Sequence, residues 1–319
     1  MSNKQQGGTA VKRLAAAIIG AAASFSLFAA YMVIPPAGLF SGLLAPFPAS
    51  YLRLRHGRMS ALTAVLGATT LMTYAFGLQA GVLYLAQCAT VSLLMPELLA
   101  RGFGAARSMA WATGVNLLIY LVAALIITFA SGQNVHLLVV KEVNESITQA
   151  IAVYEKTGIK GDELAQLSRS MKMAADLIAR IYPSLMTIML VCMAGANLAL
   201  IRRFVPARVC ELSIGEFNSY RNPEQLIWLL IVAGFALLAG TPLITVPALN
   251  VIIVLSLAYF LQGMAVILSI IARQSLAGLL RTCFYLMLLF QPYLAAMVAA
   301  IGIFDLWGDF RTPRKQENL

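Results

Sequence analysis

Hydroxyl and amide side chains lie along one face of a single apolar segment, residues 250–273. Ser256, Tyr259, Gln262 and Ser269 follow one another at steps of three, three and seven residues, which places them on one side of a helix. The segment is long and apolar enough to cross a bilayer, so these groups need protein or water beside them. The stripe therefore predicts either a seam of hydrogen bonds between helices or the lining of a small-molecule site.

Similar polar groups occur inside the other apolar segments. Amides both donate and accept hydrogen bonds, so they suit a neutral or zwitterionic ligand and equally suit contacts between helices. Gln291 belongs to the same group of amides. The candidate ligand-binding residues are Gln87, Asn116, Asn197, Asn250, Tyr259 and Gln262.

Motifs for enzymatic chemistry are missing from the sequence. It contains no phosphate-binding loop of the Walker type, no HExxH zinc motif and no nucleophile elbow. His56 and His136 lie far apart, which argues against a Ser–His–Asp site. The cysteines form no CxxC pair, so neither a zinc site nor a disulfide framework is expected. We therefore expect a protein without enzymatic activity, metal or cofactor.

The composition requires lipid as the solvent of this chain. Hydrophobic residues make up 60% of it and charged residues 11%, against about 25% charged residues in a typical soluble domain. The formal net charge is +10, but the basic residues stand in short clusters between apolar runs. This arrangement is typical of a membrane protein and argues against nucleic acid as a partner.

The apolar runs predict an all-α membrane protein, a helical bundle of about eight or nine spans. Residues 1–130 carry the first membrane helices, 182–304 carry the later ones, and 305–319 form a polar tail. The expected spans are 14–34, 38–52, 61–77, 81–100, 109–130, 182–201, 226–240, 250–273 and 282–304, and both 38–52 and 282–304 either cross fully or are re-entrant.

Residues 131–181 separate the two groups of spans and carry two apolar stripes at helical spacing. Gly158 and Gly161 lie between the stripes, and Asp162 and Glu163 mark the start of the second helix. We expect two amphipathic helices that form an extracytoplasmic hairpin. The stripes are Val143, Ile147, Ile151 and Tyr154, followed by Leu164, Leu167, Met171, Ala174 and Ile178.

The distribution of positive charge predicts the orientation in the membrane. Basic loops alternate with connections that carry no charge, so we expect the N-terminus in the cytoplasm. The basic loops lie near 53–58, 101–107, 202–221 and 273–281, and the uncharged connections lie near 35–38, 78–80 and 241–247.

The C-terminal tail breaks this charge pattern. A full crossing by 282–304 would place Arg311 and the other basic tail residues outside the cell. A re-entrant hairpin with Gln291 and Pro292 at its tip would return them to the cytoplasm. Apolar length favours the crossing and charge favours the hairpin.

Small residues repeat at four-residue spacing in the first span, as Ala16–Gly20 and Ala17–Ala21. Such spacing permits close approach of helices. It predicts either packing within the chain or docking of a partner subunit.

Charged residues near the ends of two spans predict ion pairs. Arg101 lies four residues after Glu97, the favourable order for a pair on a helix, and a coupling role for this carboxylate is the alternative. The motif DLWGDFR predicts an interfacial anchor with local ion pairs, because Trp side chains suit the membrane interface. A docking epitope for a partner is the alternative, with Asp305, Trp307, Asp309 and Arg311 as its candidate residues.

Several landmarks in the C-terminal half form a recognisable set. They are Tyr182–Pro183, Asn197 before Arg202–Arg203, Phe217, Asn222–Pro223, NVIIVLSLAYFLQGMAV at 250–266 and GIFDLWGDFR at 302–311. With them, the chain resembles the YybS-like family of multi-span bacterial membrane proteins, whose function is unknown. That family is distantly similar to the substrate-binding subunits of energy-coupling-factor vitamin transporters, and also to multi-span proteins of the cell-shape machinery. The resemblance implies a protein of the bacterial cytoplasmic (inner) membrane and brings no catalytic residues.

Two functions fit these expectations. The first is a small-molecule-binding transport subunit that needs an energising partner, because the chain has polar amides within its apolar segments and no ATPase motif. The second is an envelope-associated scaffold that acts through protein contacts of its hairpin and tail. Both place the chain in a lipid bilayer beside a membrane protein partner.

Overall fold

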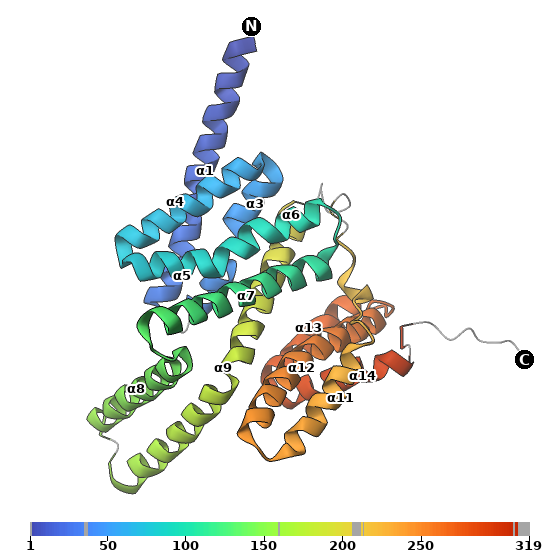
Figure 1. The fold of residues 1–319 in the computed structure, drawn as a ribbon. Coiled ribbons are helices and arrows are strands. Elements are labelled where there is room, and N and C mark those ends of the chain that lie inside the picture. The colour runs from blue at the N-terminus through green and yellow to red at the C-terminus, as the bar shows by residue number, and fades with distance from the viewer. Residues whose placement is uncertain are drawn as a thin grey trace, which may run out of the picture. The chain divides into compact units, whose positions relative to one another are not determined.

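The chain folds into helices that group into two compact units (Figure 1). The computed structural model describes residues 2–34, 38–158, 160–205, 212, 214–308 and 310–311, with side chains from residue 11 onward. Every regular element in these ranges is a helix, which confirms the predicted all-α class for the described part of the chain. Unit 1 comprises Met1–Val135 and Thr187–Ile214, and unit 2 comprises His136–Met186 and Gly215–Leu319.

Unit 1 has a core made where its first helix meets the helices that follow. Phe28 is fully buried, and its ring meets the ring of Tyr84 edge-on at a centroid distance of 5.2 Å. The elements are α1 (Ser2–Val33), α2 (Gly38–Leu44), α3 (Phe47–His56), α4 (Arg58–Phe76), α5 (Leu78–Ala89), a π-helix (Thr90–Leu94), α6 (Met95–Ala100), α7 (Ala105–Ser131) and the C-terminal part of α9 (Gly161–Phe204).

The small residues of α1 face the interior of unit 1. Ala17 and Ala21 are buried, and a Cβ added to Gly20 would lie 2.4 Å from Leu52 Cδ1 on α3. A Cβ added to Gly67 on α4 would in turn lie 3.0 Å from Ala21 Cβ. The stripe therefore holds α1 against α3 and α4, and the interpretation as packing within the chain is confirmed.

Single glycines connect α3 to α4 and α4 to α5. Gly57 and Gly77 have φ angles of 96° and 92°, a region that side chains with a Cβ disfavour. Each closes the preceding helix by donating its N–H, Gly57 to Leu52 O at 3.1 Å and Gly77 to Thr73 O at 3.0 Å. The chain thereby reverses within one residue, which keeps three successive helices in contact.

Unit 2 is organised around the crossing of two apolar helices, α12 and α14. A Cβ added to Gly263 would lie 1.8 Å from Val298 O, and one added to Gly302 would lie 2.0 Å from Tyr259 O. The two backbones therefore touch, and only glycine fits at either position. The elements of this unit are α8 (Val135–Lys156), the N-terminal part of α9, a 3₁₀ turn (Phe217–Ser219), α11 (Leu226–Ala236) with a 3₁₀ extension (Leu237–Ala239), α12 (Pro242–Ile271), α13 (Ala277–Phe290) and α14 (Tyr293–Gly308).

The two amphipathic segments predicted within 131–181 form α8 and the start of α9. Ala175 of α9 is buried, and the rings of His136 and Tyr182 stack at 5.8 Å. The half-buried positions include Val143, Ile147, Ile151, Leu164, Leu167 and Met171, all members of the predicted stripes. Their extracytoplasmic location stays a prediction.

The second of these helices does not end where the sequence predicted. A new helix was expected to start at Tyr182 and Pro183, because proline interrupts the helical hydrogen-bond ladder. Instead α9 runs without a break for 44 residues, with Pro183 in its interior.

Within the described residues, six helices are long and apolar enough to cross a membrane, or seven if α13 and α14 together count as one span. The segment predicted as a span at 38–52 is divided between α2 and α3, and the one at 226–240 is a shorter apolar helix, Leu226–Ala239. The total of eight or nine spans stays a prediction. α13 and α14 bend by 119° at their junction.

Candidate functional site

A buried carboxylate forms the centre of a polar cluster in unit 2. Asp305 lies near the end of α14, and its side chain has 0% exposure. Its Oδ2 accepts hydrogen bonds from Gln262 Nε2 at 3.1 Å and from Arg311 Nη2 at 2.9 Å. Arg221 Nε lies 4.0 Å from the same oxygen. A charge in this position requires such partners, because desolvation is costly for an unpaired carboxylate.

The amide of Gln262 extends the cluster from the carboxylate to the preceding loop. Gln262 Oε1 accepts the backbone N–H of Asn222 at 3.0 Å, and Asn222 Nδ2 donates to Ala258 O at 2.9 Å. The hydroxyl of Tyr220 donates to Asn222 Oδ1 at 2.7 Å. Burial raises the pKa of Tyr220, so this hydroxyl keeps the proton that it donates. Both ends of the Gln262 amide are therefore occupied by the protein.

Arg311 ties the start of the C-terminal tail to the same loop. It donates from Nη1 to Asn218 O at 3.0 Å and from Nη2 to Tyr220 O at 2.8 Å. Arg273, just after α12, donates to the backbone carbonyl of Arg311. The loop before α11, the end of α12, the end of α14 and the tail thus meet at one end of unit 2.

Three buried polar atoms of this region have no hydrogen-bond partner among the residues that the structure describes. They are Asp305 Oδ1, Arg311 Nε and Tyr259 Oη. Asp305 therefore accepts two hydrogen bonds at Oδ2, while its Oδ1 is still available as an acceptor. Through Oδ2 the arrangement holds the carboxylate against Gln262 and Arg311.

The cluster joins segments that the sequence analysis treated separately. Asn222, Gln262 and Asp305 each belong to a different stretch among those that carry the family resemblance, and Arg311 ends the last of these stretches. Gln262 was predicted as a ligand contact, and Asp305 and Arg311 as partner-docking residues. Asn222 was noted only as a landmark, although an Asn before a proline signals a turn whose side chain can bond to backbone.

Other docking candidates have different surroundings. Trp307 is 69% exposed, with Phe304 at 60% and Phe310 at 46%. These three aromatic residues flank the buried Asp305 and give the end of α14 an apolar surface. Asp309 lies outside the described residues.

A second cluster of charges occurs in unit 1, around Glu97 at the start of α6. Arg101 Nε lies 3.0 Å from Glu97 Oε1, as the four-residue spacing predicts. Arg53 and Arg58 also donate to this carboxylate, from α3 and from the first residue of α4. Glu97 is thus a partner of three arginines, two of which sequence spacing does not indicate.

The π-helix next to this cluster is supported by side chains from two other helices. Its hydrogen bonds run from residue i to i−5, as from Met95 N to Thr90 O. In that register Pro96 would donate to Val91 O, but proline has no N–H. Ser50 Oγ of α3 supplies the missing bond to Val91 O at 3.3 Å.

The predicted ligand residue Asn116 contacts the same irregular turn. From α7 its Nδ2 donates to Gln87 O at 3.0 Å and to Thr90 Oγ1 at 2.5 Å. Its Oδ1 has no partner in the described part of the chain, and neither do Ser108 Oγ and Thr113 Oγ1 of the same helix. Asn197 likewise joins two elements, because its Nδ2 donates to Leu43 O at 2.8 Å.

Asn250 explains how α9 continues through Pro183. A regular helix would pair Ser184 N–H with Arg180 C=O. Instead, Asn250 Oδ1 accepts from Ser184 N at 2.9 Å, and Asn250 Nδ2 donates to Arg180 O at 2.8 Å. The amide of α12 is therefore inserted into the backbone ladder of α9, a known cause of helix distortion.

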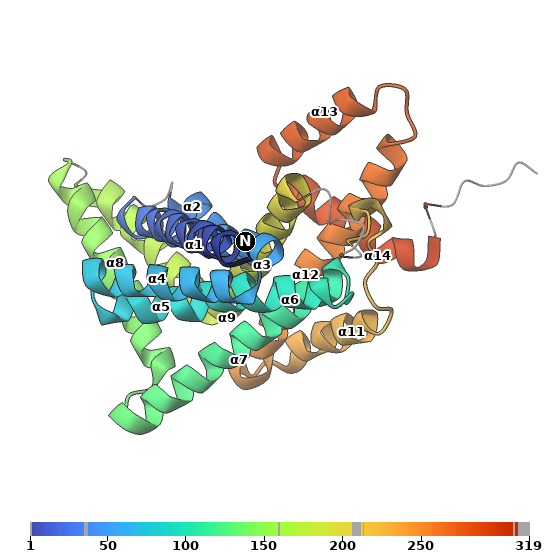
Figure 2. The ribbon, with the colours of Figure 1, turned by 90° about the horizontal axis from the view of Figure 1, so that it is seen from above.

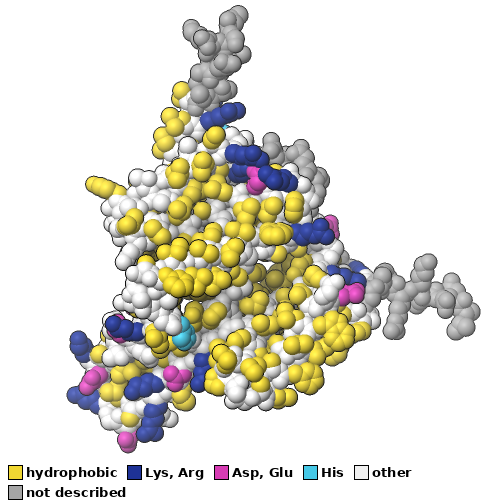
Figure 3. Space-filling view, viewed as in Figure 1, with side chains coloured by type: hydrophobic (Ala, Val, Ile, Leu, Met, Phe, Trp, Pro, Cys, Tyr) yellow, Lys and Arg dark blue, Asp and Glu magenta, His cyan; other side chains and the backbone are white. Residues whose placement is uncertain are grey.

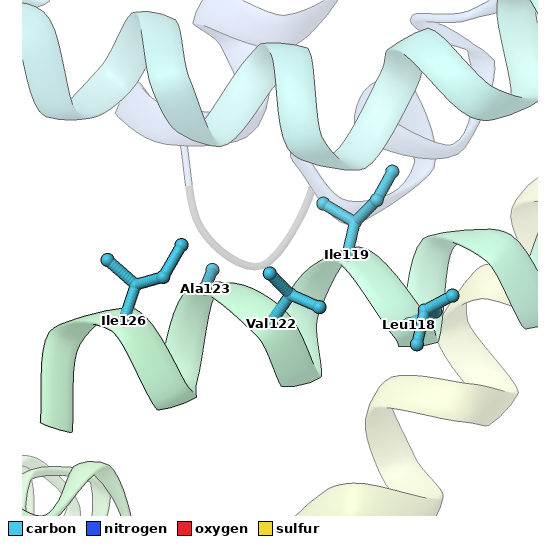
Figure 4. Close-up of a pocket in the computed structure, with 5 residues that line it drawn as sticks. All are labelled: Leu118, Ile119, Val122, Ala123 and Ile126. Atoms are coloured by element: carbon cyan, nitrogen blue, oxygen red, sulfur yellow. The ribbon is translucent and has the colours of Figure 1, made fainter. Parts of the chain in front are cut away.

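A pocket on α7 is lined by apolar side chains alone. Figure 4 shows its five lining side chains on α7, Leu118, Ile119, Val122, Ala123 and Ile126, around an open depression of about 370 Å³. Figure 3 shows apolar side chains over most of one face, with charged groups confined to a few places. These are surfaces suited to lipid or to protein, and no polar candidate lines the pocket.

The comparison with protein families agrees with this picture. A family model described as "Predicted membrane protein (DUF2232)" matches residues 22–306. The chain belongs to this family. The match covers most of the chain and includes Asn222, Gln262 and Asp305, while Arg311 lies five residues beyond its end. No curated protein and no solved structure matches this DUF2232 protein.

Proposed function

We propose that this protein is a non-enzymatic scaffold subunit of a bacterial cytoplasmic-membrane assembly, acting through protein contacts. The observation that carries the proposal is the buried Asp305 cluster. It fixes a loop, two helix ends and the tail as one surface, through contacts of Asp305 with Gln262 and Arg311. The exposed aromatic residues Phe304 and Trp307 stand on this surface.

The orientation of this surface follows from the positive-inside rule. Arg221, Arg273 and Arg311 all occur at this end of unit 2, and cytoplasmic loops of membrane proteins are enriched in such residues. We assign the surface and the N-terminus to the cytoplasmic side. The hydrogen bond from Arg273 to Arg311 O supports the re-entrant interpretation of α13 and α14, because both ends of that pair return to one place.

The positions of the amides favour the scaffold over a solute-binding subunit. The side-chain amides of Asn116, Asn197 and Asn250 each form a hydrogen bond to a neighbouring element. The amide of Gln262 joins its own helix to the loop at Asn222 and to α14 at Asp305. These amides would have to break their hydrogen bonds to neighbouring elements in order to bind a ligand. The leading expectation from the sequence, a transport subunit, therefore has less support than its alternative.

Two tryptophans of equal exposure allow a matched test. Trp307 and Trp228 of α11 are each 69% exposed. Full-length Trp307→Ala and Trp228→Ala are purified from membranes in mild detergent, and accompanying proteins are quantified by mass spectrometry. We expect Trp307→Ala to lose at least nine-tenths of a specific partner that Trp228→Ala retains. Equal partner recovery with both variants would contradict the proposal.

A second candidate function is binding of a small neutral solute in unit 1. It rests on the unused acceptor of Asn116 and on the unpartnered Ser108 and Thr113 hydroxyls of α7. Native mass spectrometry of the purified chain tests it. A retained metabolite that Asn116→Ala releases, accompanied by ATPase subunits, would support transport and would count against the scaffold.

A further inference from the structure

The Glu97 cluster of unit 1 has more positive charge than its single carboxylate can neutralise. Arg53, Arg58 and Arg101 all contact Glu97, and three positive charges against one negative charge leave an excess of two. The side chains of Arg53 and Glu97 are 15% and 16% exposed, whereas those of Arg58 and Arg101 are 68% and 62% exposed. The excess charge therefore lies at the surface, on Arg58 and Arg101.

These two arginines have hydrogen-bond donors that the cluster does not use. A guanidinium group carries five N–H donors in a planar fork. Arg58 donates to Glu97 from Nε and Nη2, and Arg101 donates from Nε alone. Within the described residues, no acceptor bonds to Arg58 Nη1 or to the terminal nitrogens of Arg101. Such forks match the oxygen atoms of a phosphate group and bind them through charge-assisted hydrogen bonds.

Both arginines stand at the end of a helix that can cross a membrane. Arg58 is the first residue of the candidate span Arg58–Phe76, and Arg101 directly follows the candidate span Leu78–Ala100. The chain reverses at Gly77 between these spans, and α3 packs against both α4 and α6 (Figure 2). The two ends therefore meet at one edge of the hydrocarbon layer, which is where the headgroups of lipids lie.

An exposed apolar stripe on α4 begins next to Arg58. Met59, Leu62 and Leu66 are 77%, 43% and 52% exposed, and their spacing of three and four residues places them on one face of the helix. The stripe runs from the arginine into the candidate span. A ligand that fits both features has a phosphate group at one end and a hydrocarbon chain at the other.

We propose that Arg58 and Arg101 together bind the phosphate group of a negatively charged phospholipid. An acyl chain of the same lipid lies along the apolar stripe of α4. The excess of two positive charges favours a headgroup with a net negative charge and disfavours one that carries an ammonium group. Basic sites between membrane helices recognise anionic lipids through this chemistry.

This inference goes beyond the scaffold function and does not depend on it. The lipid site belongs to unit 1, whereas the surface proposed to bind another protein belongs to unit 2. The two sites share no residue. Each proposal can fail without the other.

Native mass spectrometry of the full-length protein in mild detergent tests the site. Delipidated protein is titrated with phosphatidylglycerol or with phosphatidylcholine that has the same acyl chains, and the bound lipid is quantified. We expect the intact protein to prefer phosphatidylglycerol, and we expect Arg58→Gln to weaken its binding about fivefold or more, as for one arginine at a membrane surface. The matched control is Arg55→Gln, because Arg55 is an exposed arginine of α3 whose guanidinium carbon lies 5.6 Å from the centroid of the Tyr51 ring. Arg55→Gln should leave the preference unchanged.

Two further variants keep the test valid if Arg58→Gln does not fold. Arg101→Gln removes only one hydrogen bond to Glu97 and should weaken phosphatidylglycerol binding as Arg58→Gln does. Arg58→Lys keeps the charge but not the planar fork, so its affinity should lie between those of the intact protein and Arg58→Gln.

Three results would overturn the proposal. The first is equal binding of the two lipids by the intact protein, and the second is an equal loss of affinity with Arg58→Gln and Arg55→Gln. The third is displacement of phosphatidylglycerol by an excess of inorganic phosphate, which has the same oxygen atoms but no acyl chain. Displacement would assign the two arginines to a soluble anion, whereas a retained lipid supports the phospholipid.

Discussion

The two acid–arginine clusters show how differently one kind of contact can be built. Glu97 has three arginine partners and a side chain that is 16% exposed, and two of those arginines are more than 60% exposed. Asp305 has one close arginine, itself 11% exposed, and its own exposure is 0%. The Glu97 cluster therefore contains more charged groups and is more exposed to solvent than the Asp305 cluster.

The difference indicates separate roles for the two clusters. Exposed ion pairs contribute little to stability because water and salt screen them. A buried pair is sensitive to the loss of either partner, because an uncompensated charge then stays in a medium of low dielectric constant. Gln262 and Asn222 add neutral hydrogen bonds around Asp305, whereas the contacts of Glu97 within the described residues are with arginines. We therefore expect the Asp305 cluster to contribute more to the stability of the fold than the Glu97 cluster.

Removing one partner of the buried pair should have the largest effect. Arg311→Met removes the close arginine of the buried Asp305 and leaves Arg221 at 4.0 Å, and we expect the free energy of unfolding to fall by about 3–5 kcal/mol. The double variant Asp305→Leu/Arg311→Met should lose less than either single variant. Thermal unfolding of the full chain in mild detergent measures this. Additive losses in the double variant would show that the two residues do not act as a pair.

A substitution that forces α12 and α14 apart should cause the second-largest loss of stability. Gly302→Ala places a methyl group where a Cβ would lie 2.0 Å from Tyr259 O, and we expect a loss of about 1–3 kcal/mol. Gly114 on α7 is the control, because nothing lies within 4 Å of its added Cβ. Gly114→Ala should be neutral or stabilising by about 0.5–1 kcal/mol, since alanine favours helix. Equal losses would mean that helix contact does not decide the result.

The inserted amide of Asn250 should have an intermediate effect that is confined to α9. Asn250→Ala leaves Ser184 N–H and Arg180 C=O without their bridge, a loss of about 1–3 kcal/mol. Hydrogen exchange followed by mass spectrometry should show roughly tenfold faster exchange in the peptide that contains Ser184. Unchanged exchange there would mean that the helix closes its own ladder once the amide is gone.

The smallest effect is expected at the Glu97 cluster, where Arg58 and Arg101 are more than 60% exposed although Arg53 is 15% exposed. Glu97→Gln should lower the free energy of unfolding by about 1 kcal/mol at low salt. The loss should shrink further at high ionic strength, whereas the loss from Arg311→Met should not change. A salt-insensitive loss of several kcal/mol at Glu97 would remove the distinction between the clusters.

Helix positions were largely predictable from the sequence because they depend on local patterns. Apolar length gave α1, α4 and α7, but the connection expected at 78–80 is shorter, because Gly77 alone joins α4 to α5 and residues 78–80 begin α5. The continuity of α9 was not predictable, because the support for Pro183 comes from a residue 66 positions away from Ser184. Local rules describe a proline correctly only when no distant side chain compensates for it.

The candidate site was predictable in its parts and not in its assembly. Gln262 is conspicuous as a polar residue in an apolar segment, and Asp305 and Arg311 as members of the DLWGDFR motif of the tail. Their convergence joins positions 43 residues apart, which sequence spacing does not reveal. The same holds for Glu97, where spacing along the helix indicated Arg101 but not Arg53, which is 44 positions away.

The π-helix at Thr90–Leu94 determines the direction in which Glu97 points. Each residue of an α-helix turns the chain by about 100°, and a π turn accommodates one extra residue. Deleting one residue from this turn would restore α-helical geometry and rotate Glu97 by about that angle, away from Arg53 and Arg58. The five-residue π-helix thus rotates the helix that follows it, so that the Glu97 carboxylate faces the arginines of α3 and α4.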